Sequence, residues 1–189
     1  GEGAYATVVR AHRKPSSKES VLSKGPHGGV VALKLVQKSS LTDSVAANLE
    51  NEIASWGAVR HVGVCELLGT FETPSLHVLA IELCEGGSLV DVMQAQNAPL
   101  SEDQVAAALS GAVEGLCSLH ERRMLHRDIK AGNLLLTGDG CIKLGDLGIS
   151  VQLGSTMARR MTIIGTPHWL APEVIASDAG YGTAAGGGG

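Results

Sequence analysis

The densest group of polar side chains in the sequence is the run from His126 to Asn133, which reads His-Arg-Asp-Ile-Lys-Ala-Gly-Asn. It holds a carboxylate at Asp128, an ammonium at Lys130 and a carboxamide at Asn133, and it lies between apolar runs. Groups of these types can orient a hydroxyl, move a proton and neutralise charge in a reaction. A solvated loop does not readily explain this spacing, so the run is a candidate catalytic loop.

Two other charged residues have apolar surroundings. Lys34 lies in the strand-like run VVALKLV at 30–36, and Glu52 shares the apolar stripe of a predicted helix with Leu49 and Trp56. Burying either residue alone as an ion would be costly, whereas pairing the two would remove both costs. The alternative is that Lys34 extends to solvent and Glu52 sits at the edge of the helix.

Three short motifs follow the candidate catalytic loop in order. They are the triplets Asp-Leu-Gly at 146–148, Gly-Thr-Pro at 165–167 and Ala-Pro-Glu at 171–173. Each triplet is common in isolation. Their order and spacing after Asn133 are highly specific, which indicates one site built from distant segments.

The chain starts with Gly1 and Gly3, a few residues before an extended stretch around Val8. Glycines in a phosphate-covering hairpin let backbone N–H groups approach phosphate oxygens with no Cβ in the way. The alternative is that they only permit positive φ in a turn. A dinucleotide-binding loop would need a helix directly after the glycines, and the residues after Val8 favour an extended segment or a loop.

Hydrophobic periodicity predicts strands and one helix in the first half of the chain. Residues 1–10 are expected to form a strand, a glycine-rich turn and a returning strand, and residues 11–29 an exposed loop insertion. Further strands are expected at 30–36, 64–71 and 77–83, with a helix from 42 to about 56.

Helices dominate the second half. Ser88 with Asp91, and Ser101 with Gln104, have the spacing of capping boxes, so each pair should open a helix. The second helix should be long, end between 121 and 124, and carry apolar residues at helical spacing: Val105, Leu109, Val113, Leu116 and Leu119. A hairpin should then turn at 138–140 and deliver Asp146 into a loop. The last ten residues are too rich in glycine to specify a packed element.

These motifs, taken in order, resemble the protein kinase superfamily over nearly the whole chain. Lys130 in the catalytic loop and Thr166 in the Gly-Thr-Pro triplet resemble the serine/threonine branch. The amino-acid sequence of three segments is similar to that of the sterile-twenty group, and within it to that of Hippo-type members. These segments are 126–136, 148–165 and 165–175. The resemblance implies a protein kinase that uses ATP and Mg²⁺ on Ser/Thr hydroxyls of protein substrates.

The resemblance also assigns roles residue by residue. Asp128 would be the catalytic base, Lys130 would steady the transferring phosphoryl group, and Lys34 would hold the α and β phosphates with Glu52 as its partner. Residues expected to bind ATP are Gly1, Gly3, Val8, Ala32, Lys34, Ile81, Glu82, Cys84 and Leu135. Asn133 and Asp146 would be the magnesium ligands, Thr162 the phosphosite of the activation loop, and Thr166 a residue beside the substrate hydroxyl. Activation would come from an upstream kinase or from autophosphorylation in trans.

The implied fold is α+β and two-lobed. We expect a small β-rich N-lobe at 1–81 lacking the start of its first strand, a hinge at 82–87, a partial helical C-lobe at 88–180 and a glycine-rich tail at 181–189. The lobe would be truncated after the activation segment, so the chain is expected to be a fragment and could be inactive by itself. A pseudokinase or nucleotide-binding scaffold is the alternative function.

Composition narrows the possible partners and location. The chain has 189 residues, and 44% of them are hydrophobic, which argues against disorder of the chain as a whole. Its net charge of -4 argues against sequence-independent binding of nucleic acid. No segment approaches the length of an apolar membrane span, so a cytoplasmic protein is expected. The four cysteines form no Cys-x-x-Cys pair, and buried free thiols are the expectation for them.

Overall fold

The computed structural model describes residues 6–12 and 29–147. Its elements are, in chain order, β1 (Ala6–His12), β2 (Val30–Gln37), the 3-10 turn η2 (Lys38–Ser40), α1 (Asp43–Gly57), β3 (Leu67–Glu72), β4 (Leu76–Glu82), β5 (Gly87–Ser88), α2 (Leu89–Gln96), α3 (Glu102–Glu121), the 3-10 turn η3 (Ala131–Asn133), β6 (Leu134–Leu136) and β7 (Ile142–Leu144). The expected α+β fold class is confirmed.

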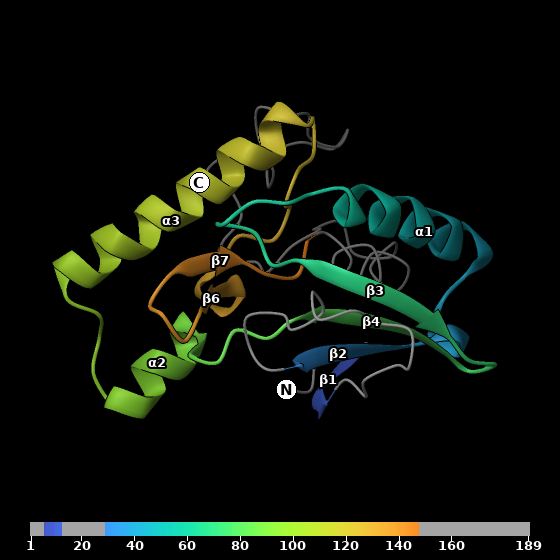
Figure 1. Cartoon of the computed structure of the whole chain (residues 1–189), viewed down its shortest axis with the longest axis horizontal. Coiled ribbons are helices and arrows are strands. Elements are labelled where there is room, and N and C mark those ends of the chain that lie inside the picture. Colours follow the sequence, from blue (N-terminus) through green and yellow to red (C-terminus); the bar gives the residue numbers. More distant parts are fainter. Residues whose placement is uncertain (1–5, 13–28, 148–189) are drawn as a thin grey trace, which may run out of the picture.

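A four-stranded antiparallel sheet forms one half of the molecule, with strand order β1-β2-β4-β3, and α1 lies beside β3 (Figure 1). Val8 lies opposite Lys34, and Ala32 lies opposite Ile81. Opposed residues share a face, and so do residues two apart on one strand. These four side chains therefore lie on one face of the sheet.

The second half is built from α2, α3 and a small sheet of β5, β6 and β7 (Figure 1). Ser88 and Ser101 each accept a hydrogen bond from the backbone N–H three residues on, and Asp91 and Gln104 return the bond, so both predicted capping boxes are confirmed. The predicted hairpin is also present as β6 and β7, with Thr137–Cys141 as its turn.

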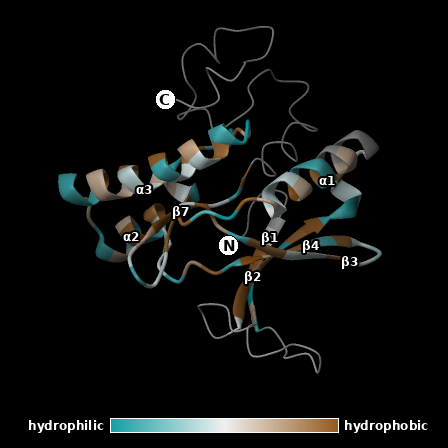
Figure 2. Ribbon diagram, turned by 45° about the horizontal axis from the view of Figure 1, so that its top comes forward, coloured by the Kyte–Doolittle hydropathy of each residue, from teal (hydrophilic) through white to brown (hydrophobic). Residues whose placement is uncertain are grey.

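One hydrophobic core joins the two halves. Val36, Leu79, Leu49 and Trp56 bring β2, β4 and α1 into it, and Leu144 brings in β7. Figure 2 shows the strands of the larger sheet as largely hydrophobic, whereas hydropathy varies along α3. The Trp56 Nε1–H donates to the Cys65 backbone oxygen at 2.7 Å, which satisfies the indole inside this core.

Two expectations about the strands need correction. β3 begins at Leu67, because Val64 instead pairs with Leu144 in an isolated parallel bridge. Residues 11 and 12 belong to β1, which extends the ladder with β2.

The apolar stripe of α3 is only partly buried. Leu119 is buried, whereas Val105, Leu109 and Val113 are exposed. Small residues at 108, 112 and 115 pack inward.

Within the part of the chain that the structure describes, no helix is long and apolar enough to cross a bilayer. The expected glycine-rich tail, and the part of the expected C-lobe after residue 147, lie outside that part. The limits of the lobes and hinge stay predictions.

Candidate active site

His126 anchors the loop that follows α3. Its ring is fully buried, its Nε2 lies 2.8 Å from the Gly145 oxygen, and its Nδ1 lies 3.4 Å from the Asp128 nitrogen. Burial lowers the pKa of His126. A neutral ring that donates from Nε2 and accepts at Nδ1 satisfies both contacts. His126 thus ties the loop carrying Asp128 to the segment carrying Asp146, a role that sequence reasoning did not assign.

Asp128 is the centre of a compact polar cluster. Its Oδ2 lies 2.8 Å from Lys130 Nζ and 2.9 Å from Asn133 Nδ2, and the same amide donates to the Asp128 backbone oxygen at 2.7 Å. The Asp128 and Asn133 side chains are both buried. The turn η3 positions Asn133, because the Asn133 N–H donates to the Lys130 oxygen at 2.8 Å. These contacts fix the orientation of the Asp128 carboxylate.

Lys34 and Asp146 form an ion pair between β2 and the end of β7. Lys34 Nζ lies 2.7 Å from Asp146 Oδ1, and the Lys34 side chain is 3% exposed whereas that of Asp146 is 37% exposed. Asp146 has a φ of 54°, a conformation that Asp tolerates better than most residues. The preceding Gly145 N–H donates to the Asn133 oxygen at 2.9 Å. Asp146 and the Asp128 cluster are therefore held together.

Glu52 has a contact that the sequence did not predict. Its Oε1 lies 3.4 Å from Arg127 Nη1. Burial raises the pKa of Glu52, and the positive charge of Arg127 opposes that shift. Asp146 thus supplies a negative charge at Lys34, and Arg127 supplies a positive charge at Glu52. The expected pairing of Lys34 with Glu52 stays a prediction.

The residues expected around an adenine ring come mainly from β1, β2, β4 and β6. Ala32 and Leu135 are half-buried, Ile81 is buried, and Val8 is 37% exposed. Glu82 ends β4, and both of its carboxylate oxygens contact Lys143 Nζ, at 2.6 and 2.8 Å. This pair joins the expected hinge to β7. Sequence reasoning missed it, although Lys143 between Ile142 and Leu144 is a charged residue in an apolar strand.

Four of the predicted site residues, Gly1, Gly3, Thr162 and Thr166, lie outside the described residues. Those at 34, 52, 128, 130, 133 and 146 are brought together by the contacts above. Among the described residues there is no cluster of three or more His, Cys, Asp or Glu side chains that could hold a metal.

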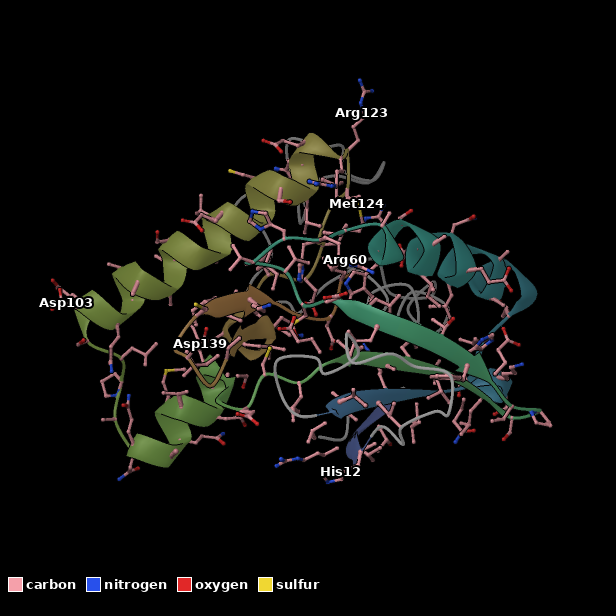
Figure 3. All side chains as sticks on the ribbon, in the orientation of Figure 1. His12, Arg60, Asp103, Arg123, Met124 and Asp139 are labelled. Carbon is pink, nitrogen blue, oxygen red and sulfur yellow. The ribbon has the colours of Figure 1, made fainter. Side chains whose placement is uncertain are left out.

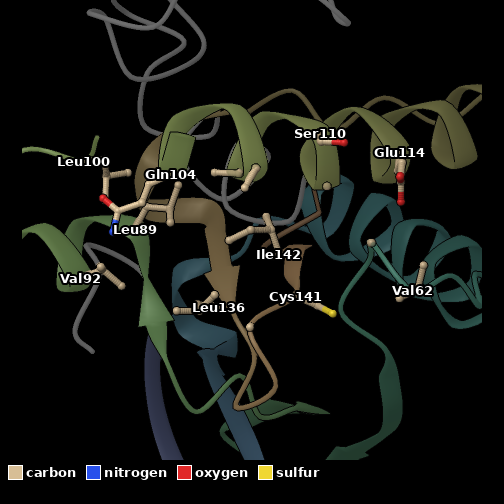
Figure 4. A pocket seen from close by; sticks show the side chains of 15 residues that line it. Val62, Leu89, Val92, Leu100, Gln104, Ser110, Glu114, Leu136, Cys141 and Ile142 are labelled. Carbon is tan, nitrogen blue, oxygen red and sulfur yellow. The ribbon is translucent and has the colours of Figure 1, made fainter. Parts of the chain in front are cut away.

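A separate cavity of about 490 Å³ opens between α2, α3 and the β6–β7 hairpin (Figure 4). Its lining is mostly apolar, with Leu89, Leu100, Leu136 and Ile142 among its residues. It includes none of the predicted site residues. The polar cluster at Asp128, rather than this cavity, therefore holds the candidate chemistry.

Comparison with known proteins gives one consistent family. The model of the protein kinase domain matches residues 1–186. The chain is 40% identical over 185 residues to serine/threonine-protein kinase cst-1 of Caenorhabditis briggsae, covering 98% of this chain and 34% of that protein. It is 39% identical over 183 residues to serine/threonine-protein kinase hippo of Drosophila melanogaster, covering 96% of this chain and 25% of that protein.

A third relative, serine/threonine-protein kinase 4 homolog A of Dictyostelium discoideum, is 38% identical over 181 residues, which cover 96% of this chain and 36% of that protein. The resemblance to Hippo-type kinases is thus confirmed. The chain spans about a third or less of the length of these relatives.

Proposed function

This chain belongs to the protein kinase domain family, and from that membership we propose that it transfers the γ-phosphoryl group of ATP to Ser/Thr hydroxyls of protein substrates. The observation that carries the proposal is the junction of three segments: Lys34 from β2, Asp128 from the loop after α3, and Asp146 after β7. Phosphoryl transfer has a loose transition state that needs alignment and charge neutralisation more than covalent help.

Each side chain has a role that its contacts support. The Asp128 carboxylate is oriented by Lys130 and Asn133, so it can align a substrate hydroxyl and accept its proton. The Lys130 ammonium lies beside that carboxylate, where it can neutralise charge on the phosphoryl group in transit. Lys34 supplies a second ammonium from the sheet face that also carries Ala32 and Ile81.

The donor set also fits Mg²⁺. Asn133 uses its Nδ2 for both contacts with Asp128, which leaves its amide oxygen as the ligand atom, and Asp146 supplies a carboxylate. Amide and carboxylate oxygens are the ligands that this hard cation prefers. When bound, the ion would neutralise phosphate charge. Asn133 and Asp146 are the residues that would hold it.

Removing the Asp146 carboxylate tests the proposal. Asp146→Asn should lower transfer of labelled phosphate from ATP to the chain itself and to a Ser/Thr protein substrate by at least about a hundredfold. Asp103→Asn is the matched control, because Asp103 is exposed in the first turn of α3, at the far end of that helix (Figure 3). Nucleotide binding without transfer in the unmodified chain would favour the pseudokinase or scaffold alternative instead.

We also propose regulation through Thr162. Phosphorylation would add about -1.5 to -2 charge, which needs a cation to hold it. Arg127 is next to Asp128, its side chain is 37% exposed, and it already contacts a carboxylate. A phosphate on Thr162, added by an upstream kinase or in trans, would bind Arg127 and align Asp128 with Asp146. Ser155, Thr156 and Thr166 are the rival sites.

A double-mutant cycle tests this pairing. Thr162→Ala and Arg127→Ala should each lower activity, and the double variant should be little worse than either single variant. Arg127 also contacts Glu52. A second cycle that combines Arg127→Ala with Glu52→Gln therefore measures how much of the Arg127→Ala effect comes from losing that contact. Additive losses for Thr162 and Arg127 would overturn the pairing. The protein substrates and the cytoplasmic location also remain proposals.

A further inference from the structure

Two of the four cysteines face each other in the interior. Cys65 Sγ and Cys84 Sγ lie 3.4 Å apart, although the residues are 19 positions apart in sequence. Cys65 is 0% exposed and Cys84 is 9% exposed. The other two, Cys117 and Cys141, are exposed. The role expected for Cys84 at the adenine edge uses its backbone, so no role proposed for the active site uses either buried thiol.

Backbone hydrogen bonds hold the segment around Cys65 and the segment around Cys84 in place. The Glu82 N–H donates to the Glu66 oxygen at 2.9 Å, so the residue after Cys65 and the end of β4 lie side by side. The Cys65 N–H donates to the Leu144 oxygen at 2.9 Å, and the Cys84 oxygen accepts from the Gly87 N–H at 3.2 Å. Both main chains are therefore fixed where the sulfur atoms meet.

The remaining movement is small. A disulfide needs its sulfur atoms about 2.05 Å apart, and they start at 3.4 Å. Closing the bond requires the two sulfur atoms to approach each other by this difference. The more accessible thiol, Cys84, lies in the connection between β4 and β5, so a molecule as small as hydrogen peroxide could reach it first.

The surroundings make the two thiols unequal. The hydrogen bond between the two thiols lowers the pKa of Cys84, although burial and the charge of Glu82 oppose this shift. The same hydrogen bond, together with burial, raises the pKa of Cys65. Cys84 is thus the thiol that ionises first, and the thiolate is the form that reacts with oxidants.

We propose that Cys65 and Cys84 are a redox modification site, which closes to an intramolecular disulfide when the protein meets a peroxide. The Cys84 thiolate attacks one peroxide oxygen, the O–O bond breaks, and Cys84 becomes a sulfenic acid as hydroxide leaves and takes up a proton to form water. The Cys65 sulfur then attacks the Cys84 sulfur, the S–S bond forms, and a second water leaves with the Cys65 proton. Two thiols are oxidised and one hydrogen peroxide is reduced to two waters.

The disulfide would connect the expected hinge to the segment before β3. Cys84 is one of the residues expected to meet the adenine edge, so closing the bond should change the KM for ATP; this consequence alone rests on the proposed kinase function. The disulfide itself can be detected by mass spectrometry of the peptides, without any measurement of activity. A failure of the disulfide proposal can therefore be told apart from a failure of the proposed kinase function.

The experiment uses the full chain with Cys117→Ser and Cys141→Ser, which removes the exposed thiols. The folded protein is treated with hydrogen peroxide, blocked with iodoacetamide and cleaved after glutamate. Trypsin alone would not separate the pair, because no Lys or Arg lies between Arg60 and Arg122. Cleavage after Glu52, Glu66, Glu82 and Glu85 places Cys65 in 53–66 and Cys84 in 83–85.

The expected product is these two peptides joined, lighter by two hydrogen atoms than their sum, and restored to separate peptides by dithiothreitol. In the matched variant with Cys65→Ser added, Cys84 should instead stop at sulfenic or sulfinic acid. The same treatment in urea should greatly reduce the cross-link, because the fold is what holds the thiols together. Recovery of both cysteines as separately oxidised or unmodified residues from the folded chain would overturn the proposal.

Discussion

At the residue scale, Lys34 shows how one site residue can matter for chemistry more than for stability. Its ammonium is buried, and its partner Asp146 is exposed enough to be hydrated alone. Removing a charge from a buried position avoids its desolvation cost, and the carboxylate that remains is not stranded in the core. The free energy of unfolding should therefore change little, whereas phosphate recognition should be lost.

We expect Lys34→Met to lower kcat/KM for phosphoryl transfer by at least about a hundredfold, or about 2.7 kcal/mol at 1.36 kcal/mol per tenfold change. Lys38→Met is the matched control, since Lys38 forms an exposed pair with Glu72 at 2.8 Å and should retain full activity. Steady-state kinetics and urea denaturation of both variants provide the measurement. Equal turnover by Lys34→Met and the unmodified chain would remove Lys34 from the mechanism.

His126 gives a prediction about pH. Its pKa is lowered in the folded state by burial, so the unfolded chain takes up a proton at His126 before the folded chain does. The free energy of unfolding should fall as the pH drops below about 6.5, the value for an unperturbed histidine. The stabilisation from keeping this ring neutral is present above that pH and is lost on acidification.

His126→Gln keeps an N–H group that can donate to the Gly145 oxygen but cannot titrate. Between pH 5 and pH 7 its free energy of unfolding should depend on pH less steeply than that of the unmodified chain. Burial of Glu52 acts in the opposite direction, because its raised pKa favours the folded state on acidification, but both proteins keep Glu52. His120→Gln, at an exposed position of α3, is the control and should leave the slope unchanged.

At the element scale, α3 touches the segment before β3 through its backbone. A Cβ added at Gly115 would lie 2.4 Å from the Gly63 oxygen, and one added at Gly63 would lie 2.9 Å from the Gly115 nitrogen. Gly63 also accepts a hydrogen bond from the Leu144 N–H at 2.8 Å. This close contact brings α3 against the strand that leads to Asp146.

Gly115→Ala should therefore destabilise the fold by about 1–3 kcal/mol through overpacking, even though alanine favours a helix over glycine by about 1 kcal/mol. Gly69→Ala is the control, because nothing lies within 4 Å of a Cβ built there. Thermal unfolding of the two variants compares the sites. An unchanged or higher Tm for Gly115→Ala would show that α3 can move away from Gly63 without any loss of stability.

At the scale of the whole molecule, one side of α3 remains uncovered by the described residues. Val105, Leu109 and Val113 are 40%, 54% and 55% exposed, and they lie at helical spacing along one side of α3. A contiguous apolar surface of this kind drives association between molecules. The chain expressed alone should therefore be prone to self-associate.

Replacing this surface tests that expectation. Leu109→Lys together with Val113→Glu should reduce self-association in dilute solution, measured by light scattering against protein concentration. Leu68→Lys, at an exposed apolar position of β3 in the other half, is the control and should change association less. A monomeric unmodified chain with one sharp cooperative thermal transition would contradict the prediction.

The sequence by itself determined the features that depend on neighbouring residues. Both capping boxes join residues three apart, the hairpin at 137–141 turns on its own glycines, and the Asp128, Lys130 and Asn133 cluster forms within one short loop. Local rules suffice for these, because the interacting groups are brought together by a single turn of backbone. The ordered motifs likewise indicated the family before any fold was known.

Only the tertiary structure decided which distant side chains meet. Lys34 and Asp146 are 112 positions apart and Glu52 and Arg127 are 75 apart, and each contact depends on how distant elements pack together. The same holds for the two buried thiols and for the face of α3 that turns inward. Periodicity identifies an apolar stripe, but the close approach at Gly115 selects small residues for that contact, while Val105, Leu109 and Val113 of the stripe stay exposed. Long-range packing geometry has no local signature in the chain, which is why these pairings could not be predicted from sequence.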